Sequence, residues 1–227
     1  MIDSQFRAGF ERSVKPIGIR LRRLGITADH LTATGMVMSV AAAVSLGFGN
    51  LQLGLLFLIL CGLPDALDGA VAKAGGTSSP RGAFFDSVAD RVSDAFLFGG
   101  VAWYFAAHRP GLGVMLPVAV LALSGLISYQ RAKAEAMGFT AKGGILMERA
   151  ERMILLGLGL LFEVLLVPVL WLMVALTALT AVQRFVLVWR QASAAPAGGA
   201  STRRTARRRA ARRRSIRSWQ RLRTSRR

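Results

Sequence analysis

Residues 64–90 read PDALDGAVAKAGGTSSPRGAFFDSVAD, and this stretch decides how the rest of the chain is interpreted. Asp65 and Asp68 are three residues apart, so they share one face if their segment is helical. Asp86 and Asp90 are four apart and do the same on the next segment. Hydrophobic sequence flanks the stretch on both sides. Burying four carboxylates there is costly unless positive charge lies between them.

Lys73 and Arg81 are the basic residues between the two carboxylate pairs. Carboxylates that converge from two helices with so few cationic partners favour a divalent metal site. We therefore expect Mg2+ or Mn2+, which are hard ions that prefer oxygen ligands, and we expect two ions. A hydrated turn with surface aspartates is the alternative, and the membrane-like flanks disfavour it.

The same stretch resembles the signature of the CDP-alcohol phosphotransferases, or CDP-alcohol phosphatidyltransferases, through the pattern Asp65-x2-Asp68-Gly69-x2-Ala72-Lys73-x8-Gly82-x3-Asp86-x3-Asp90. These are integral membrane enzymes of phospholipid synthesis. Every position matches except Lys73, where the family has Arg. Lysine keeps the charge but lacks the bidentate fork of a guanidinium. The resemblance implies an all-α membrane protein with six transmembrane helices.

Charge and hydrophobic residues are segregated along the chain. The 227 residues are 53% hydrophobic, yet the formal net charge is +18. Thirteen arginines and no acidic residue lie within 203–227. We expect 191–227 to be a disordered, Arg-rich cytosolic tail that lies against membrane lipids. Residues 1–24 are predicted to form an amphipathic, basic juxtamembrane helix, and 25–190 the six-helix domain.

Six hydrophobic segments follow one another, and several have lengths near the roughly 20 residues needed to cross a bilayer, while the last two are short or tightly joined. Thr27 or Asp29 is expected to cap the start of the first, and Glu163 and Pro168 are expected to mark the turn between the last two. Most Lys and Arg lie in alternate connections and at both ends of the chain. The positive-inside rule then places both termini and the active site in the cytosol, with the chain multi-pass in the cell membrane. The predicted spans are 31–48, 51–67, 83–106, 113–131, 152–167 and 168–188.

A second polar stretch runs from Ser128 through the 131–152 loop, and Arg184 adds a cation inside a later apolar run. Basic residues at three helix ends, on the same side as the carboxylates, indicate a second pocket that binds a phosphate. Ordinary positive-inside flanking is the alternative for any one of them. Asp94 is expected to face inward and pair with Arg91 or another cation, and it is not counted as a metal ligand.

These flanks resemble the actinobacterial phosphatidylinositol phosphate synthases. The shared features are a Ser-Tyr-x-basic-Ala-basic-Ala-Glu run from Ser128, a Glu-Arg-x-Glu-Arg run from Glu148, and a late Gln-Arg pair ending at Arg184. The subfamily has Lys then Arg where this chain has Arg131 then Lys133. The resemblance implies these acceptor-phosphate ligands: Ser128, Arg131, Lys133, Arg152 and Arg184.

The implied reaction transfers the phosphatidyl group of CDP-diacylglycerol to a phosphorylated alcohol, with 1D-myo-inositol 1-phosphate favoured. The products are phosphatidylinositol phosphate and CMP. Asp90 is implied as the general base, and the metal ligands are Asp65, Asp68, Asp86 and Asp90. The family's CDP-diacylglycerol contacts carry over to Asp29, Thr32, Gly69, Ala72 and Lys73. Family members are typically homodimers, so a homodimer is expected.

Two other functions are alternatives to this transfer reaction. A phosphatidylglycerophosphate synthase that uses glycerol 3-phosphate is the runner-up within the family. A cation transporter is the alternative from a different class, because transporters also bury carboxylates. Its carboxylates should lie near the bilayer midplane, whereas these cluster at one edge beside the 73–81 loop. Nucleic acid is not expected as a partner, although the tail alone is basic enough for nonspecific RNA binding.

Overall fold

The computed structural model describes residues 20, 25, 27–75, 79–141 and 147–194, and for 64–75 it describes the backbone alone. All regular structure within these residues is helical, as predicted. The predicted juxtamembrane helix at 1–24 and the predicted tail from 195 onward lie outside this description, apart from Arg20. Both therefore stay predictions.

Capping residues explain where two of the first three helices begin. Helix α2 (Ala28–Gly47) starts after Thr27, whose side chain accepts a hydrogen bond from the backbone N–H of His30 in a capping box. Thr27 is thus the cap of the two candidates. Helix α4 (Pro80–His108) starts after Ser79, which caps Gly82 N–H at 3.0 Å, with Pro80 in the first turn.

Helix α3 (Leu51–Gly75) is longer than its predicted span, which stopped at residue 67. Lys73 was assigned to a loop, and this was wrong, because the helical backbone continues through it. Helix α5 (Met115–Met137) follows the short 3-10 helix η1 (Leu112–Val114) and also runs past its predicted end at 131. Span lengths were predicted from hydropathy, whereas polar residues readily extend a helix beyond the apolar part.

The last two helices divide at a different residue from the one predicted. Helix α6 (Arg149–Leu161) ends before Phe162, and α7 (Glu163–Ala194) begins at once. Glu163 does mark the turn, but Pro168 does not, since it lies inside α7. Pro168 is the sixth residue of α7, so it removes one backbone donor from the helix, yet the helix continues past it to Ala194. Helix α7 also includes residues 191–194, which were predicted to belong to the disordered tail.

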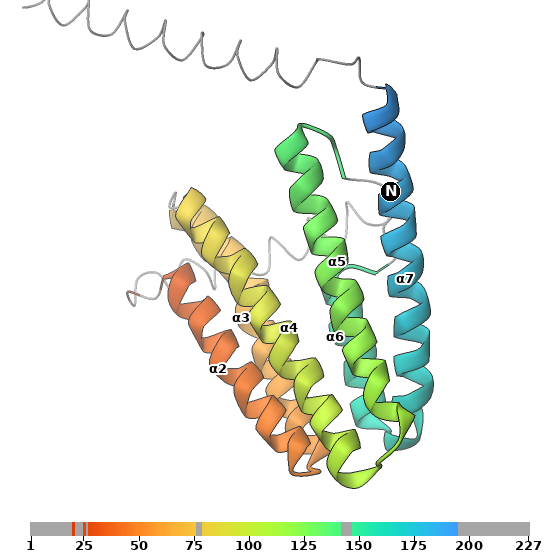
Figure 1. Ribbon diagram of the computed structural model, residues 1–227. Coiled ribbons are helices and arrows are strands. Elements are labelled where there is room, and N and C mark those ends of the chain that lie inside the picture. The colour runs from red at the N-terminus through yellow and green to blue at the C-terminus, as the bar shows by residue number, and fades with distance from the viewer. Residues whose placement is uncertain (1–19, 21–24, 26, 76–78, 142–146, 195–227) are drawn as a thin grey trace, which may run out of the picture. The chain divides into compact units, whose positions relative to one another are not determined.

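The chain divides into two compact units, and the divisions fall within α5 and α7. The larger unit comprises Met1–Ile127 and Ile145–Ala181, and the smaller comprises Ser128–Gly144 and Val182–Arg227. In the larger unit α2 packs against α3 and α4, and α3 packs against α6 (Figure 1). Its apolar core is built mostly from leucine, phenylalanine and methionine side chains, with Leu46, Leu97, Phe98, Leu156, Leu170 and Met173 almost fully buried.

Small residues allow the helices of the larger unit to approach closely. A Cβ added at Gly100 of α4 would collide with the backbone of Ala43 on α2. A Cβ at Gly47 would collide with the Trp103 ring, and one at Gly54 with the Leu46 side chain. Glycine contacts of this kind are typical of helix packing in membranes, where close van der Waals fit replaces the hydrophobic effect.

The helix surfaces are suited to lipid. Within the part of the chain that the structure describes, three helical segments are long and apolar enough to cross a membrane, namely Ala28–Gly47, Leu112–Met137 and Glu163–Ala194. A shorter apolar segment is Leu51–Leu63. Large apolar side chains such as Ile59, Val164 and Trp171 face outward and are more than half exposed. An apolar exterior of this extent indicates a membrane protein.

A polar cluster closes the end of the larger unit where α4 and α7 meet. The Tyr104 hydroxyl and Arg109 Nη2 each donate to Glu163 Oε1 at 2.7 Å. Arg109 and Glu163 are both about half exposed, with side chains 49% accessible. This cluster gives an exposed ion pair for comparison with the buried ones at the candidate site.

Candidate active site

Three aspartates follow one face of α4 at intervals of four residues, and their burial increases along the helix. Asp86 and Asp90 are half-buried, whereas Asp94 is buried with 1% of its surface exposed. An i, i+4, i+8 spacing places all three on the same face, as the sequence predicted for the first two. The partners of this face therefore decide the chemistry of the site.

Helix α6 supplies two cations to the buried end of this face. Arg149 Nη1 lies 2.8 Å from Asp90 Oδ1, and Arg149 Nε donates to Asp94 Oδ1 at 3.2 Å. Arg152 Nη2 donates to Asp94 Oδ2 at 3.1 Å, and its Nη1 donates to the Met147 carbonyl at 3.3 Å. The prediction that Asp94 faces inward and pairs with a cation is confirmed, and the cations come from α6.

Arg91 is the neighbouring cation on α4 itself. Its Nη2 lies 3.5 Å from Asp90 Oδ2, which is a weaker contact than the 2.8 Å pair made by Arg149. Asp90 therefore has an arginine on each carboxylate oxygen. Its tighter partner comes from another helix.

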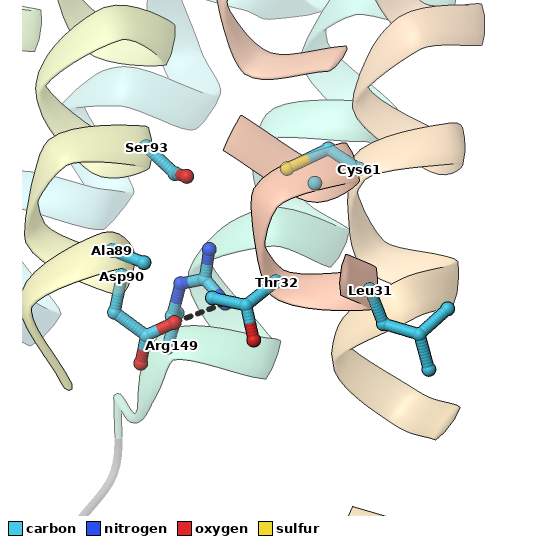
Figure 2. Close-up of a pocket in the computed structure, with 8 residues that line it drawn as sticks. Leu31, Thr32, Cys61, Ala89, Asp90, Ser93 and Arg149 are labelled. Atoms are coloured by element: carbon cyan, nitrogen blue, oxygen red, sulfur yellow. Dashed lines mark ion pairs between the residues drawn. The ribbon is translucent and has the colours of Figure 1, made fainter. Parts of the chain in front are cut away.

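A small pocket surrounds the Asp90–Arg149 pair (Figure 2). Its free space is about 10 Å3, which is roughly the room that one water molecule needs. Helices α2, α3, α4 and α6 all contribute to it, so the pocket lies wholly within the larger unit. The lining residues are Leu31, Thr32, Gly35, Cys61, Ala89, Asp90, Ser93 and Arg149.

Two residues predicted to contact the nucleotide are brought to this region by α2. Thr32 lines the pocket beside Asp90, and its hydroxyl donates to the Ala28 carbonyl at 3.1 Å. Asp29 lies in the first turn of α2 and faces the start of α4, where its carboxylate is 3.9 Å from Arg81. A Cβ at Gly82 would lie 3.9 Å from Asp29 Oδ1, which is ordinary van der Waals contact, so the starts of α2 and α4 lie close together.

Residues Asp65, Asp68, Gly69, Ala72 and Lys73 all lie on the last turns of α3, where the structure describes the backbone alone. Among the side chains that are described, no group of three or more His, Cys, Asp or Glu could hold a metal ion. Asp86 and Asp90 are described, and their carboxylates one helical turn apart supply the oxygen donors that a hard divalent ion prefers. The α4 half of the predicted site therefore offers oxygen donors, although Asp90 is paired with arginines here, and the metal site stays a prediction.

The residues predicted to bind an acceptor phosphate divide between the two units. Ser128, Arg131, Lys133 and Arg184 belong to the smaller unit, and Arg152 belongs to the larger. Arg131 and Lys133 are exposed on α5, with Arg131 Nε donating to Glu135 at 3.1 Å. Arg184 is buried, with 6% of its surface exposed.

Arg149 was not among the predicted site residues, although it makes the shortest ion pair to Asp90. A signal was present in the Glu-Arg-x-Glu-Arg run, where Arg149 and Arg152 are three residues apart. That spacing puts both on one face of the first turn of α6. The spacing does not say which of the two arginines reaches Asp90 on α4. The structure shows that it is Arg149.

Comparisons with known proteins identify related enzymes. A phosphatidylinositol phosphate synthase of Mycobacterium marinum is 36% identical over 193 residues, covering 81% of this chain and 82% of that protein. An archaetidylinositol phosphate synthase of Methanothermobacter thermautotrophicus is 37% identical over 198 residues, covering 83% and 94%.

Solved structures of a phosphatidylinositol phosphate synthase are also similar to this chain. The crystal structure of Mycobacterium tuberculosis phosphatidylinositol phosphate synthase with CDP-DAG bound matches with a TM-score of 0.73 at 35% identity, covering 83% of this chain and 96% of that one. The structure of the same enzyme in complex with manganese and citrate also matches with a TM-score of 0.73, at 34% identity. The sequence profile of CDP-alcohol phosphatidyltransferases matches residues 25–182, and this chain therefore belongs to the CDP-alcohol phosphatidyltransferase family of enzymes.

Proposed function

We propose that this chain transfers the phosphatidyl group of CDP-diacylglycerol to inositol 1-phosphate, giving phosphatidylinositol phosphate and CMP. The observation that carries this proposal is the aspartate face of α4, on which Asp90 pairs with Arg149. It occurs in a chain that is 36% identical to phosphatidylinositol phosphate synthases over most of its length. A related enzyme of known structure contains CDP-DAG, which supports the same lipid donor here.

Asp65, Asp68, Asp86 and Asp90 would hold the divalent metal, with two Mg2+ or Mn2+ ions proposed. Such ions neutralise the pyrophosphate and stabilise the departing CMP. A relative crystallised with manganese supports a divalent ion at this site. Asp29, Thr32, Gly69, Ala72 and Lys73 are proposed to contact CDP-diacylglycerol, and Thr32 supports this by lining the pocket next to Asp90.

Asp90 would orient the acceptor hydroxyl and take its proton as the attack proceeds. The hydroxyl oxygen forms a bond to the phosphorus that carries the diacylglycerol, and the bond from that phosphorus to CMP breaks. CMP leaves with the bonding electron pair, and the proton passes to Asp90. Arg149 keeps the Asp90 carboxylate in one orientation through the 2.8 Å pair.

The phosphate of the acceptor is proposed to bind Ser128, Arg131, Lys133, Arg152 and Arg184. A phosphate dianion is well matched to arginine because several charge-assisted hydrogen bonds form in fixed directions. Arg184 is buried, and it is included because it ends the late Gln-Arg pair that this chain shares with the subfamily. Arg152 is buried and also forms an ion pair with Asp94.

The membrane arrangement is also a proposal. Six transmembrane helices within 25–190, both termini in the cytosol, and an active site on the cytosolic side of the cell membrane together follow the charge of the connections. The three long apolar segments support the membrane location. A homodimer and a lipid-associated tail at 191–227 complete the proposal.

The deciding experiment measures CMP release by the purified chain in detergent with CDP-diacylglycerol and Mg2+. Inositol 1-phosphate, glycerol 3-phosphate, serine and free inositol are offered in parallel. Turnover with inositol 1-phosphate and little with free inositol is expected, because free inositol lacks the anchoring phosphate. Preference for glycerol 3-phosphate would replace the proposed acceptor with the runner-up. Equal use of serine or free inositol would refute a phosphate-binding acceptor site.

A further inference from the structure

Asp94 is a buried carboxylate that the proposed chemistry does not use. Its side chain is 2% exposed and lies on α4 four residues beyond Asp90, on the same face. A carboxylate in such surroundings is strongly destabilising unless its charge is paired and its oxygens accept hydrogen bonds. Its partners therefore indicate what it does.

Both oxygens of Asp94 are bound by the first turn of α6. Oδ1 accepts from Arg149 Nε at 3.2 Å, and Oδ2 accepts from Arg152 Nη2 at 3.1 Å. The two arginines are three residues apart, so one carboxylate fixes two neighbouring side chains of the same helix turn.

Arg149 connects Asp94 to Asp90, because it forms an ion pair with each of them. Arg149 uses Nε for Asp94 and Nη1 for Asp90, so its planar guanidinium is set by two carboxylates at once. A rigid fork held at both ends has little freedom to rotate. The orientation of Asp90 is thereby tied to Asp94 through a residue of another helix.

We propose that Asp94 is a positioning residue for the transfer reaction. It holds Arg149 and Arg152 at the start of α6, and through Arg149 it orients the carboxylate of Asp90 toward the acceptor. This inference rests on the proposed function, in which Asp90 and Arg152 face the acceptor. Asp94 itself contacts neither substrate nor metal in this proposal.

The test is the steady-state kinetics of Asp94→Asn in detergent, with full-length protein, Mg2+, CDP-diacylglycerol and inositol 1-phosphate. Asparagine keeps the shape but removes the charge that fixes both arginines. The KM for inositol 1-phosphate should rise tenfold or more, while the KM for CDP-diacylglycerol stays within threefold of wild type. An unchanged acceptor KM, or an equal rise in both constants, overturns the proposal.

A charge-balanced variant covers the case in which Asp94→Asn does not fold. Asp94→Asn combined with Arg152→Gln removes one buried charge of each sign. Its acceptor KM should exceed that of Arg152→Gln alone by at least threefold, because Arg149 has also lost its anchor. Equal acceptor constants for these two variants would show that Asp94 does not act through Arg149, and would overturn the proposal.

Val101→Ala is the control for a purely structural effect. Val101 is a buried core residue on the same helix, two turns beyond Asp94. It should lower thermal stability while leaving both KM values within threefold of wild type. Failure of the proposed function is recognised separately, since wild type would then transfer nothing to inositol 1-phosphate. The Asp94 series is in that case measured with whichever acceptor the wild type uses, and the same outcomes decide it.

Discussion

Arg149→Gln tests whether burial, rather than distance, decides the value of an ion pair in this protein. Two Arg–carboxylate pairs have nearly equal lengths. Arg149–Asp90 is 2.8 Å with side chains 15% and 21% exposed, and Arg109–Glu163 is 2.7 Å with both 49% exposed. If distance alone decided, the two ion pairs would contribute equally to the stability of the protein. Burial predicts that the two substitutions lower the free energy of unfolding by amounts that differ several-fold.

The expected magnitudes follow from what each substitution leaves behind. Arg149 also pairs with the buried Asp94, and removing one partner of a buried pair costs about 3–5 kcal/mol; we take the lower end because Asp94 keeps Arg152 and Asp90 keeps Arg91. A loss of about 3 kcal/mol lowers the Tm of a chain of this size by about 6–12 °C. Arg109→Gln breaks an exposed pair worth about 0.2–1 kcal/mol, so its Tm should fall by no more than about 4 °C.

The assay is thermal unfolding in one detergent and buffer, followed by tryptophan fluorescence, with wild type, Arg149→Gln and Arg109→Gln side by side. Arg149→Lys is a third variant, which keeps the charge but cannot bridge Asp90 and Asp94 as a fork does. Its Tm should fall between those of wild type and Arg149→Gln. Equal shifts for Arg149→Gln and Arg109→Gln would refute the reasoning, as would a wild-type Tm for Arg149→Gln.

Two further predictions concern the metal and the packing of α2 on α4. Excess EDTA should abolish CMP release, and Mg2+ or Mn2+ should restore it, because the clustered carboxylates need a divalent counter-charge; full activity in EDTA would contradict the metal proposal. Gly100→Ala should lower the Tm, since its new Cβ meets the Ala43 backbone, whereas Gly99→Ala has nothing within 4 Å and should be neutral or stabilising by up to about 1 kcal/mol. Similar Tm values for the two glycine variants would contradict the close approach of these helices.

Local rules predicted much of the secondary structure. Thr27 was one of two candidate caps, and it caps α2 because its side chain reaches the third residue of the helix. Glu163 was placed at the last turn, where α7 does begin. Pro168 misled the prediction because a proline can end a helix or lie inside one, as it does in α7. Which case applies depends on a boundary that hydropathy does not define.

Side-chain pairing between helices was predicted less completely. Helical spacing placed Asp90 and Asp94 on one face, and the apolar surroundings required a cation for Asp94. Neither rule says which helix is adjacent, because that depends on how the whole chain packs. Arg149 makes the shortest ion pair to Asp90, although the two residues lie far apart in the sequence.

Charge balance is the physical rule that could have identified Arg149. Asp94 was excluded from the metal site, so its charge required a protein cation of its own. One arginine would satisfy that need, yet the first turn of α6 carries two, Arg149 and Arg152, on one face. The second cation is then surplus to Asp94 and must serve another anion nearby, and Asp90 is the next carboxylate one turn along α4. The structure contains this arrangement, with Arg149 bound to both aspartates. Counting charges by helix face, rather than by motif, would thus have made Arg149 a candidate, and the structure then shows which carboxylates it binds.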